Sequence, residues 1–233
     1  YFYIELFGVE NMKKANQLMI AIVTVGACLV VSPAFAQKAG DIIVRVGPAR
    51  VMPNDDSGEV KPLAGTGVEV DDATSLGFTF SYLYTDNIGI GLLGALPFEH
   101  DIKGDKGAID GVDIGSIKQL PPTLVVEYYF QPNKPVRPYI GAGINYTYFF
   151  DEDADSELEG IVGDTDIDLD DSFGLAAVGG VDVDINDDWF FNASVWYIDI
   201  DTTAKLKTED AGNLKVDVDI DPWVVMLGVG TRF

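Results

Sequence analysis

Few residues in this sequence have side chains and spacing suited to metal binding or catalysis. Acidic residues recur at alternate positions at the start of segment 151–171, at Asp151, Asp153 and Asp155. Carboxylates spaced in this way ligate calcium in binding loops. Such a loop needs a glycine and a bidentate glutamate where this chain has Ser156 and Val162. We therefore interpret segment 151–171 as a solvated acidic loop and predict no metal site, with weak divalent binding beside lipopolysaccharide as the alternative.

The one histidine and the one cysteine do not indicate an enzyme. His100 has no nucleophile or carboxylate partner that the sequence points to, although the spacing of a Ser-His-Asp site is compatible with it. Cys28 lies within the N-terminal apolar run, so the chain after it has no thiol chemistry. We predict that the protein is not an enzyme and carries no cofactor.

Charge and hydrophobicity are both high in this chain. Its 233 residues include 38 Asp and Glu against 15 Lys and Arg, for a net charge of -23, and yet 47% are hydrophobic. The acidic balance argues against nucleic acid as a partner and favours lipid headgroups bridged by divalent cations. After residue 36, no apolar run reaches the roughly 18 to 20 residues of a spanning helix. Strands are then the remaining way to cross a membrane.

The N-terminal segment has the pattern of a secretory signal peptide. Residues 12–36 contain a basic start, an apolar run and a small-x-small end, which predicts cleavage after Ala36. Lipoprotein processing at Cys28 is a weaker alternative because apolar residues continue beyond it. We expect residues 1–11 to be an extension from a misplaced start, and residues 37–233 to form a single domain.

Alternating apolar residues between turn signals predict eight strands in that domain. The predicted segments are 41–52, 75–85, 88–99, 118–130, 137–150, 172–185, 189–204 and 215–233. Their connections alternate between short turns and long polar segments at 53–74, 100–117, 151–171 and 205–214. An even number of strands with alternating connection lengths is typical of an outer-membrane barrel.

The two faces of these strands distinguish a membrane barrel from a soluble one. In the second strand one face is apolar and aromatic, with Leu76, Phe78, Phe80, Tyr82 and Tyr84. The opposite face is small and polar, which suits a narrow lumen, whereas a soluble lipocalin-like barrel would have the reverse polarity. We predict an all-β protein: an eight-stranded antiparallel transmembrane β-barrel with short periplasmic turns and longer extracellular loops.

The same alternation assigns side chains to the lumen. Four bulky apolar residues are expected to point inward at similar depth and form a channel constriction, at Leu93, Trp196, Val224 and Met226. Charged inward positions are expected nearer the periplasm, at Arg45, Glu127, Asp182, Asp184 and Arg232. Buried charges persist when they are paired, so these residues predict an ion-pair network that forms the floor of the lumen. Such a network could either fill and stabilise a closed lumen or act as a gate, and the sequence favours neither role.

Six strings spread over the predicted strands resemble one known family. They are TDNIGIGLLGALPFEH (85–100), LPPT (120–123), RPYIGAGINYT (137–147), DSFG (171–174), WYIDIDTTA (196–204) and DPWVVM (221–226). Together they are similar to the outer membrane protein W (OmpW) family. The resemblance implies a hydrophobic lumen that passes small apolar molecules, with lateral exit through the wall, and a narrowing at Leu93 and Trp196. It also implies that Phe233 is a signal read by the barrel-insertion machinery. Gly91 stands where the family often has an acidic residue, which removes a lumen charge.

We therefore expect a passive channel for small hydrophobic molecules in the bacterial outer membrane, with membrane lipid, lipopolysaccharide, the insertion machinery and apolar solutes as partners. The alternative is a structural or surface-interaction barrel that acts through its extracellular loops. A small ion pore controlled by Arg45 and Glu127 is a third hypothesis.

Overall fold

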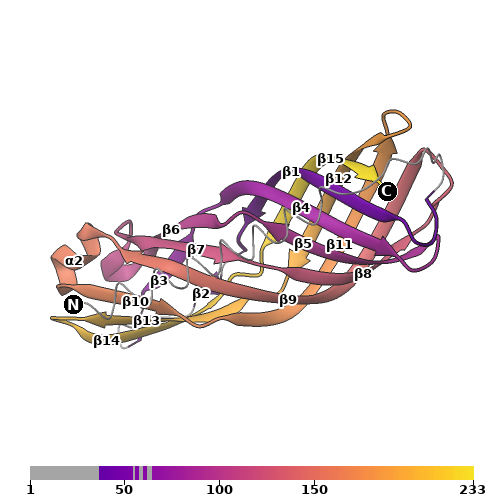
Figure 1. Cartoon of the computed structure of the whole chain (residues 1–233). Helices are drawn as coiled ribbons and strands as arrows, with labels where there is room; N and C mark the ends of the chain where they lie inside the picture. The colour runs from indigo at the N-terminus through magenta and orange to yellow at the C-terminus, as the bar shows by residue number, and fades with distance from the viewer. Residues whose placement is uncertain (1–36, 55, 58–59, 62–64) are drawn as a thin grey trace, which may run out of the picture. The chain divides into compact units, whose positions relative to one another are not determined.

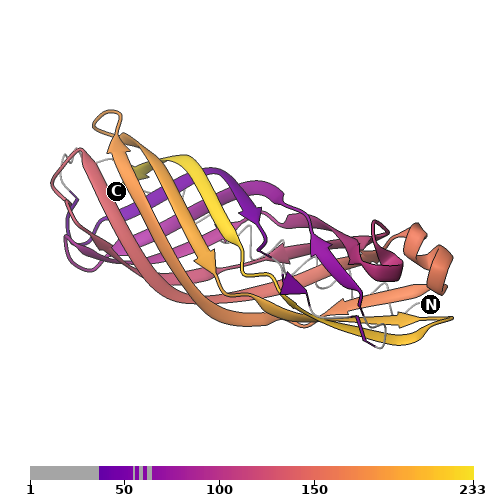
Figure 2. The same cartoon turned by 180° about the vertical axis from the view of Figure 1, so that it is seen from behind.

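The computed structural model describes residues 37–54, 56–57, 60–61 and 65–233. The expected signal peptide 12–36, the extension 1–11 and Cys28 lie outside the described residues. The domain is a closed antiparallel barrel of eight strands (Figures 1 and 2). These strands are β1 (Ile42–Met52), β4 (Ala73–Leu83), β5 (Ile88–Ala95), β8 (Thr123–Tyr129), β9 (Val136–Ala154), β11 (Ser172–Asp184), β12 (Trp189–Ile198) and β15 (Trp223–Arg232). They follow the order β11-β12-β15-β1-β4-β5-β8-β9, and pairing of β9 with β11 closes the barrel.

Short turns connect strands at one end of the barrel, which we call the turn end. They span residues 84–87, 130–135 and 185–188. Thr85 Oγ1 accepts a hydrogen bond from the backbone N–H of Ile88 at 2.9 Å, and Asn186 Oδ1 accepts one from that of Trp189 at 2.9 Å. Such side-chain acceptors satisfy backbone groups locally, which is why these short polar sequences form tight turns.

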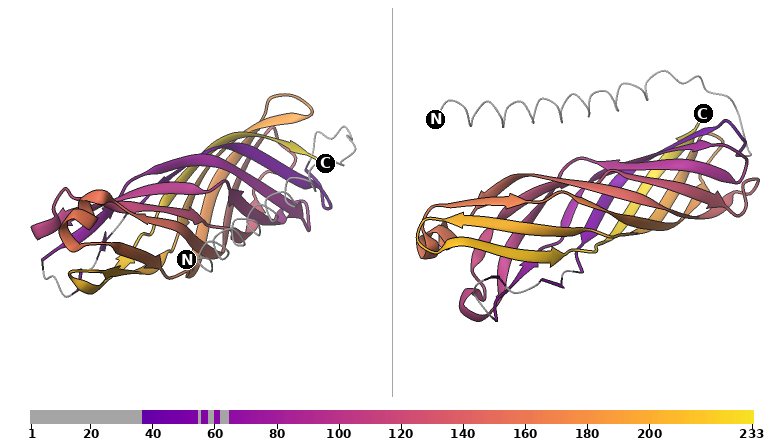
Figure 3. Two further views of the ribbon diagram at one scale, coloured as in Figure 1. Left: turned by 60° about the vertical axis from the view of Figure 1, so that its left-hand side comes forward. Right: turned by 90° about the horizontal axis from the view of Figure 1, so that it is seen from below.

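The other end continues into further strands, which together we call the extension. It contains β2 (Asp56–Ser57), β3 (Gly67–Val70), β6 (Phe98–Lys106), β7 (Asp113–Leu120), β10 (Thr165–Leu169), β13 (Asp201–Thr208) and β14 (Gly212–Asp219), with the short helices η1 (Gly107–Ile109) and α2 (Ser156–Val162). One sheet of the extension has the order β3-β6-β7-β9, using the end of β9, and the other has the order β10-β13-β14-β2. The view from below shows the β13–β14 hairpin lengthening the barrel wall (Figure 3).

The extension corrects two predictions. The long segments expected to be polar loops, 53–74, 100–117, 151–171 and 205–214, are largely strands and short helices where they are described. The expected strands 88–99, 118–130, 189–204 and 215–233 are each two strands. Three of these breaks fall at or next to prolines, at Pro97, Pro121, Pro122 and Pro222. Proline has no N–H to donate to a ladder, so pairing stops there and the chain changes partners between barrel and extension.

The outer face of the barrel is apolar. Exposed residues on it include Leu76, Tyr82, Ile90, Leu124, Val126, Ile140, Ile144, Leu175, Phe191, Val195, Leu227 and Val229. Aromatic side chains mark the belt near the turn end, at Tyr84, Phe130 and Trp189, and near the extension, at Tyr146, Phe173 and Trp223. Among the residues that the structure describes, no helix has the length and apolar content of a membrane span.

Candidate functional site

The four residues predicted to narrow the channel lie together inside the barrel. Leu93, Trp196, Val224 and Met226 are each at most 4% exposed. Trp196 is opposite Val224 in the β12–β15 register, and Met226 is opposite Ala49 in the β15–β1 register. A cavity of only about 10 Å³ remains beside them, lined by Ala49, Leu93, Gly94, Ala95, Phe98, Pro121, Ile198 and Val224. We call these residues, with Trp196 and Met226, the collar. A cavity of that size is at the lower limit for one water molecule, so the side chains of the collar are tightly packed.

A larger apolar cavity, which we call the pocket, lies within the extension. Its volume is about 60 Å³, and among the described residues that line it Thr202 is the single polar one. The other lining residues are Val60, Val68, Val70, Ile102, Ile109, Ile114, Ile117, Leu158, Ile161, Val162, Ile167, Leu169, Ala204, Leu206, Leu214, Val216, Val218 and Ile220. Alternation in the strands of both sheets turns these aliphatic side chains inward and leaves charged residues outside. The pocket can therefore hold an apolar group but offers almost nothing to hydrogen-bond with.

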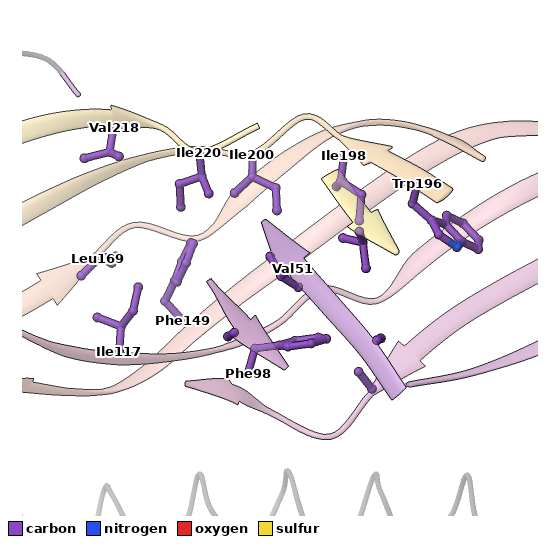
Figure 4. Packing of buried hydrophobic residues seen from close by; sticks show 14 of the residues in the cluster. Val51, Phe98, Ile117, Phe149, Leu169, Trp196, Ile198, Ile200, Val218 and Ile220 are labelled. Atoms are coloured by element: carbon purple, nitrogen blue, oxygen red, sulfur yellow. The ribbon is translucent and has the colours of Figure 1, made fainter. Parts of the chain in front are cut away.

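Buried apolar side chains connect the pocket to the collar. Ile220, Ile200 and Ile198 follow one another toward Trp196, and Phe149 and Phe98 lie across from them (Figure 4). The buried residues form one cluster that includes members of both the pocket and the collar. We refer to this continuous apolar interior as the apolar path.

The apolar path ends on a buried ion pair. Arg45 donates from Nε and Nη2 to the two carboxylate oxygens of Asp182 at 2.9 and 2.8 Å, and both side chains are 1% exposed. Arg45 Nη2 also donates to Tyr129 Oη at 2.9 Å, and Tyr129 in turn donates to Glu127 Oε2 at 2.8 Å. Asn192 donates to Asp182 Oδ1 at 2.8 Å. These bonds join side chains from four strands, β1, β8, β11 and β12, and fill the lumen at this level.

A second group of charges lies at the turn end. Arg137 donates to both carboxylate oxygens of Asp184, at 2.8 and 2.6 Å, and Arg232 donates to Asp184 Oδ1 at 3.1 Å. The Phe190 ring lies within 6 Å of the guanidinium carbons of Arg45, Arg137 and Arg232. We call the two groups together the ion-pair floor.

The ion-pair floor contains all five charged residues expected in the lumen, namely Arg45, Glu127, Asp182, Asp184 and Arg232. The sequence reasoning missed Arg137, Tyr129 and Tyr139, although each has inward parity in its strand. The hydroxyl of Tyr139 accepts a hydrogen bond from Asn192 at 3.0 Å. Counting by twos from Glu127 and from Asn145 would have found them. Arg137 was missed because it stands beside the turn, where strand boundaries are least certain.

Gly91 leaves room for the carboxylate of Glu127. A Cβ atom added to Gly91 would lie 2.8 Å from Glu127 Oε1. Glu127 of β8 therefore places a carboxylate in the space where an acidic side chain at position 91 would lie.

His100 is buried in β6, contrary to the expectation of a loop residue. Its Nδ1 donates to the Asp71 backbone carbonyl at 2.7 Å, and its Nε2 accepts from Gln119 Nε2 at 2.8 Å. Burial lowers the pKa of His100 from its ordinary value of 6.5, while the hydrogen bond to Asp71 and the charges of Asp72 and Asp101 oppose that shift. A neutral imidazole held in one tautomer results.

The acidic segment 151–171 forms regular structure. Asp151 pairs with Lys118 at 3.4 Å, and the Asp155 carboxylate accepts from the Glu157 backbone N–H as the N-cap of α2. A different set of carboxylates could hold a cation among the described residues: Asp199, Asp201 and Asp221 have oxygens within 4.8 Å of one another.

A closed even-numbered barrel with an apolar outer belt and aromatic borders is the architecture of an outer-membrane β-barrel. The sequence model of the OmpW family matches residues 38–233. Outer membrane protein W of Vibrio cholerae is 47% identical over 89% of this chain and 95% of its own length. The crystal structure of OprG from Pseudomonas aeruginosa is 43% identical, covers 85% of this chain and 98% of its own, and superposes with a TM-score of 0.81.

The chain belongs to the OmpW family. It is thus a protein of the bacterial outer membrane, and the predicted family and fold are confirmed. The family consists of non-enzymatic barrels, which agrees with the prediction that the chain is not an enzyme. In such barrels the short turns face the periplasm and the long connections face outward, so the turn end is periplasmic and the extension extracellular.

Proposed function

We propose that this protein is a passive channel through which small hydrophobic molecules cross the outer membrane. The observation that carries the proposal is the apolar path, which runs from the pocket in the extracellular extension to the collar inside the barrel. Transfer of an apolar solute from water into such an interior is favourable by about 25 cal/mol for each Å² of apolar surface buried.

The ion-pair floor supports lateral exit of the solute. An apolar molecule that passes the collar meets Arg45, Asp182 and Glu127, which are already hydrogen-bonded to one another or through Tyr129. Passing through would separate buried charges, and removing one partner of such a pair costs about 3 to 5 kcal/mol. Exit sideways into the membrane avoids that cost.

The barrel wall is interrupted beside the collar. The β5–β8 ladder ends at the pair Leu93 and Thr123, and the β6–β7 ladder begins at Phe98 and Gln119. Three prolines lie in the gap, at Pro97, Pro121 and Pro122. The collar cavity is lined by Gly94, Ala95 and Pro121 of the same segments. Because few backbone hydrogen bonds need to break there, we propose this interruption as the exit.

A charge placed in the apolar path tests the proposal. We expect Trp196→Asp in the collar and Val216→Asp in the pocket to lower uptake of an apolar dye that becomes fluorescent in phospholipid, because an unpaired buried carboxylate is strongly unfavourable next to an apolar solute. Asn213→Asp, on the exposed face of the same strand β14 as Val216, is the matched control and is expected to leave uptake unchanged.

Folding is checked by the heat-dependent mobility of the barrel on denaturing gels. Unchanged uptake in folded Trp196→Asp and Val216→Asp barrels would contradict a channel function and would favour the surface-interaction hypothesis. A second comparison tests the exit route: Arg232→Ser, which weakens the ion-pair floor at the turn end, is expected to leave uptake of the apolar dye unchanged if the solute leaves through the wall.

Lipopolysaccharide and the barrel-insertion machinery are the partners we propose in addition to membrane lipid. Phe233 directly follows β15, the last strand of the barrel. Its replacement by serine is expected to lower the amount of barrel assembled in cells without preventing refolding of the purified chain in detergent.

A further inference from the structure

Two polar side chains contact each other on the apolar path, where the collar meets the pocket. They are His100 of β6 and Gln119 of β7, and each is 1% exposed. The inward neighbours of each residue line the collar cavity on one side and the pocket on the other, namely Phe98 and Ile102 around His100, and Pro121 and Ile117 around Gln119. The pair therefore lies at the junction of the two apolar regions.

Their hydrogen bonds fix the proton on one ring nitrogen of His100. The Asp71 backbone carbonyl can only accept, so His100 Nδ1, at 2.7 Å, must carry a hydrogen. Nε2 is then an acceptor and receives the bond from Gln119 Nε2 at 2.8 Å. The other atom of that amide, Gln119 Oε1, is buried and has no hydrogen-bond partner.

This geometry can accommodate a second proton on His100. If Nε2 becomes protonated, a half-turn of the Gln119 amide brings its Oε1 to the position from which it accepts the new N–H. After this rotation the Gln119 amide oxygen has a hydrogen-bond partner and the amide nitrogen has none, which is the reverse of the arrangement before it. The number of buried polar atoms without a hydrogen bond therefore hardly changes. A protonated imidazole would then have both of its N–H groups bonded.

We propose that His100 and Gln119 form a proton-operated gate on the apolar path, open when His100 is neutral and closed when it is charged. The inference rests on the proposed function, whose regulation it describes. A solute at the junction would have to contact the charged ring in an apolar surrounding, where an ion is poorly solvated. Acid therefore closes the apolar path.

The groups around His100 act on its pKa in opposite directions, and the net effect lowers the pKa from its ordinary value. Asp71 and Asp72 lie between β3 and β4, Asp101 lies on β6, and all three carboxylates favour the charged ring. Lys103 pairs with Asp71 at 2.7 Å and Arg50 pairs with Asp72 at 2.6 Å, which weakens their effect. Burial opposes protonation more strongly than any of them, so protonation requires a pH below 6.5.

Nuclear magnetic resonance of the ring nitrogens tests the switch directly, because the chain has one histidine. We expect the Nδ1-protonated neutral tautomer at about pH 7.5 and a doubly protonated ring on acidification, with a simultaneous change in the side-chain amide signals of Gln119. Gln119→Met, which removes the acceptor, is expected to lower the midpoint by about one pH unit. A ring that stays neutral to about pH 4.5, or one that titrates without a change at Gln119, would overturn the proposal.

Uptake of the apolar dye by lipid vesicles tests the consequence. We expect it to fall about tenfold between about pH 7.5 and pH 5 for the unmodified barrel, and the ratio of the two rates to be near one for His100→Asn, whose amide can still donate to Asp71. Equal uptake at both pH values, with His100 observed to titrate, would overturn the gate. No uptake at either pH would contradict the channel function instead, while the titration remains measurable.

Discussion

Replacement of Asp182 by asparagine is expected to destabilise the barrel strongly. Asp182 accepts two hydrogen bonds from Arg45, at 2.9 and 2.8 Å, and one from Asn192 at 2.8 Å. Asparagine keeps one acceptor oxygen but turns an amide nitrogen toward a donor, and Arg45 loses its ion-pair partner while 1% exposed. Breaking a buried pair in this way costs about 3 to 5 kcal/mol.

A matched pair on the outside of the protein provides the control. Arg50 and Asp72 form the same type of ion pair at 2.6 Å, but their side chains are 60% and 40% exposed. Exposed pairs contribute about 0 to 1 kcal/mol because water screens and replaces them. We therefore expect Asp72→Asn to change the free energy of unfolding by less than about 1 kcal/mol.

The assay is reversible urea unfolding of the barrel in lipid vesicles, followed by tryptophan fluorescence. Equal losses for Asp182→Asn and Asp72→Asn would refute the argument that burial sets the strength of the inner pair. The double replacement Arg45→Met with Asp182→Leu removes both charges and is expected to recover most of the stability that Asp182→Asn loses. A double variant as unstable as the single one would show that packing, and not the unpaired charge, causes the loss.

Three further substitutions test other contacts. Gly47→Ala is expected to lower the free energy of unfolding by at least about 2 kcal/mol in the same assay, because the new Cβ would lie 2.0 Å from a backbone oxygen of β15. Gly179→Ala is the control and is expected to lower it far less, because nothing lies within 4 Å of a Cβ at that position. Gly91→Glu is expected to destabilise the barrel because the new Cβ would lie 2.8 Å from Glu127 Oε1. The double variant Gly91→Glu with Glu127→Gly is expected to recover the lost stability. A double variant as unstable as Gly91→Glu would contradict the idea that both positions place a carboxylate in the same space. Burial lowers the pKa of His100 below 6.5, so the contribution of this residue to stability is present above pH 6.5 and is lost as the pH falls toward the lowered pKa. We expect His100→Asn to flatten this dependence of the unfolding free energy on pH. An unchanged pH dependence would contradict the assignment to His100.

The alternation of side chains was enough to predict the barrel and its two faces. A period of two in Leu76 to Tyr84 requires one apolar and one small face, and the structure exposes Leu76, Tyr82 and Tyr84 on the outside. The same counting predicted that Leu93, Trp196 and Arg45 point inward, because parity along a strand needs no knowledge of its neighbours. The sequence strings also indicated the family correctly.

Contacts between distant strands could be found only in the tertiary structure. Arg45 and Asp182 are 137 residues apart, and their pairing depends on the stagger of β1 and β11 around the barrel. The extension was mistaken for loops because its charged outer face resembles a solvated segment, whereas its inward aliphatic residues need a second sheet to cover them. The pocket therefore exists only when both sheets are assembled.

The sequence by itself determined which side chains face lipid and which face the lumen, since that follows from local geometry alone. The tertiary structure decided which inward side chains touch: Glu127 fills the space of Gly91, and His100 contacts Gln119 at the junction of the collar and the pocket. The physical reason is that strand register and barrel closure fix distances between residues far apart in sequence, and no local pattern records them.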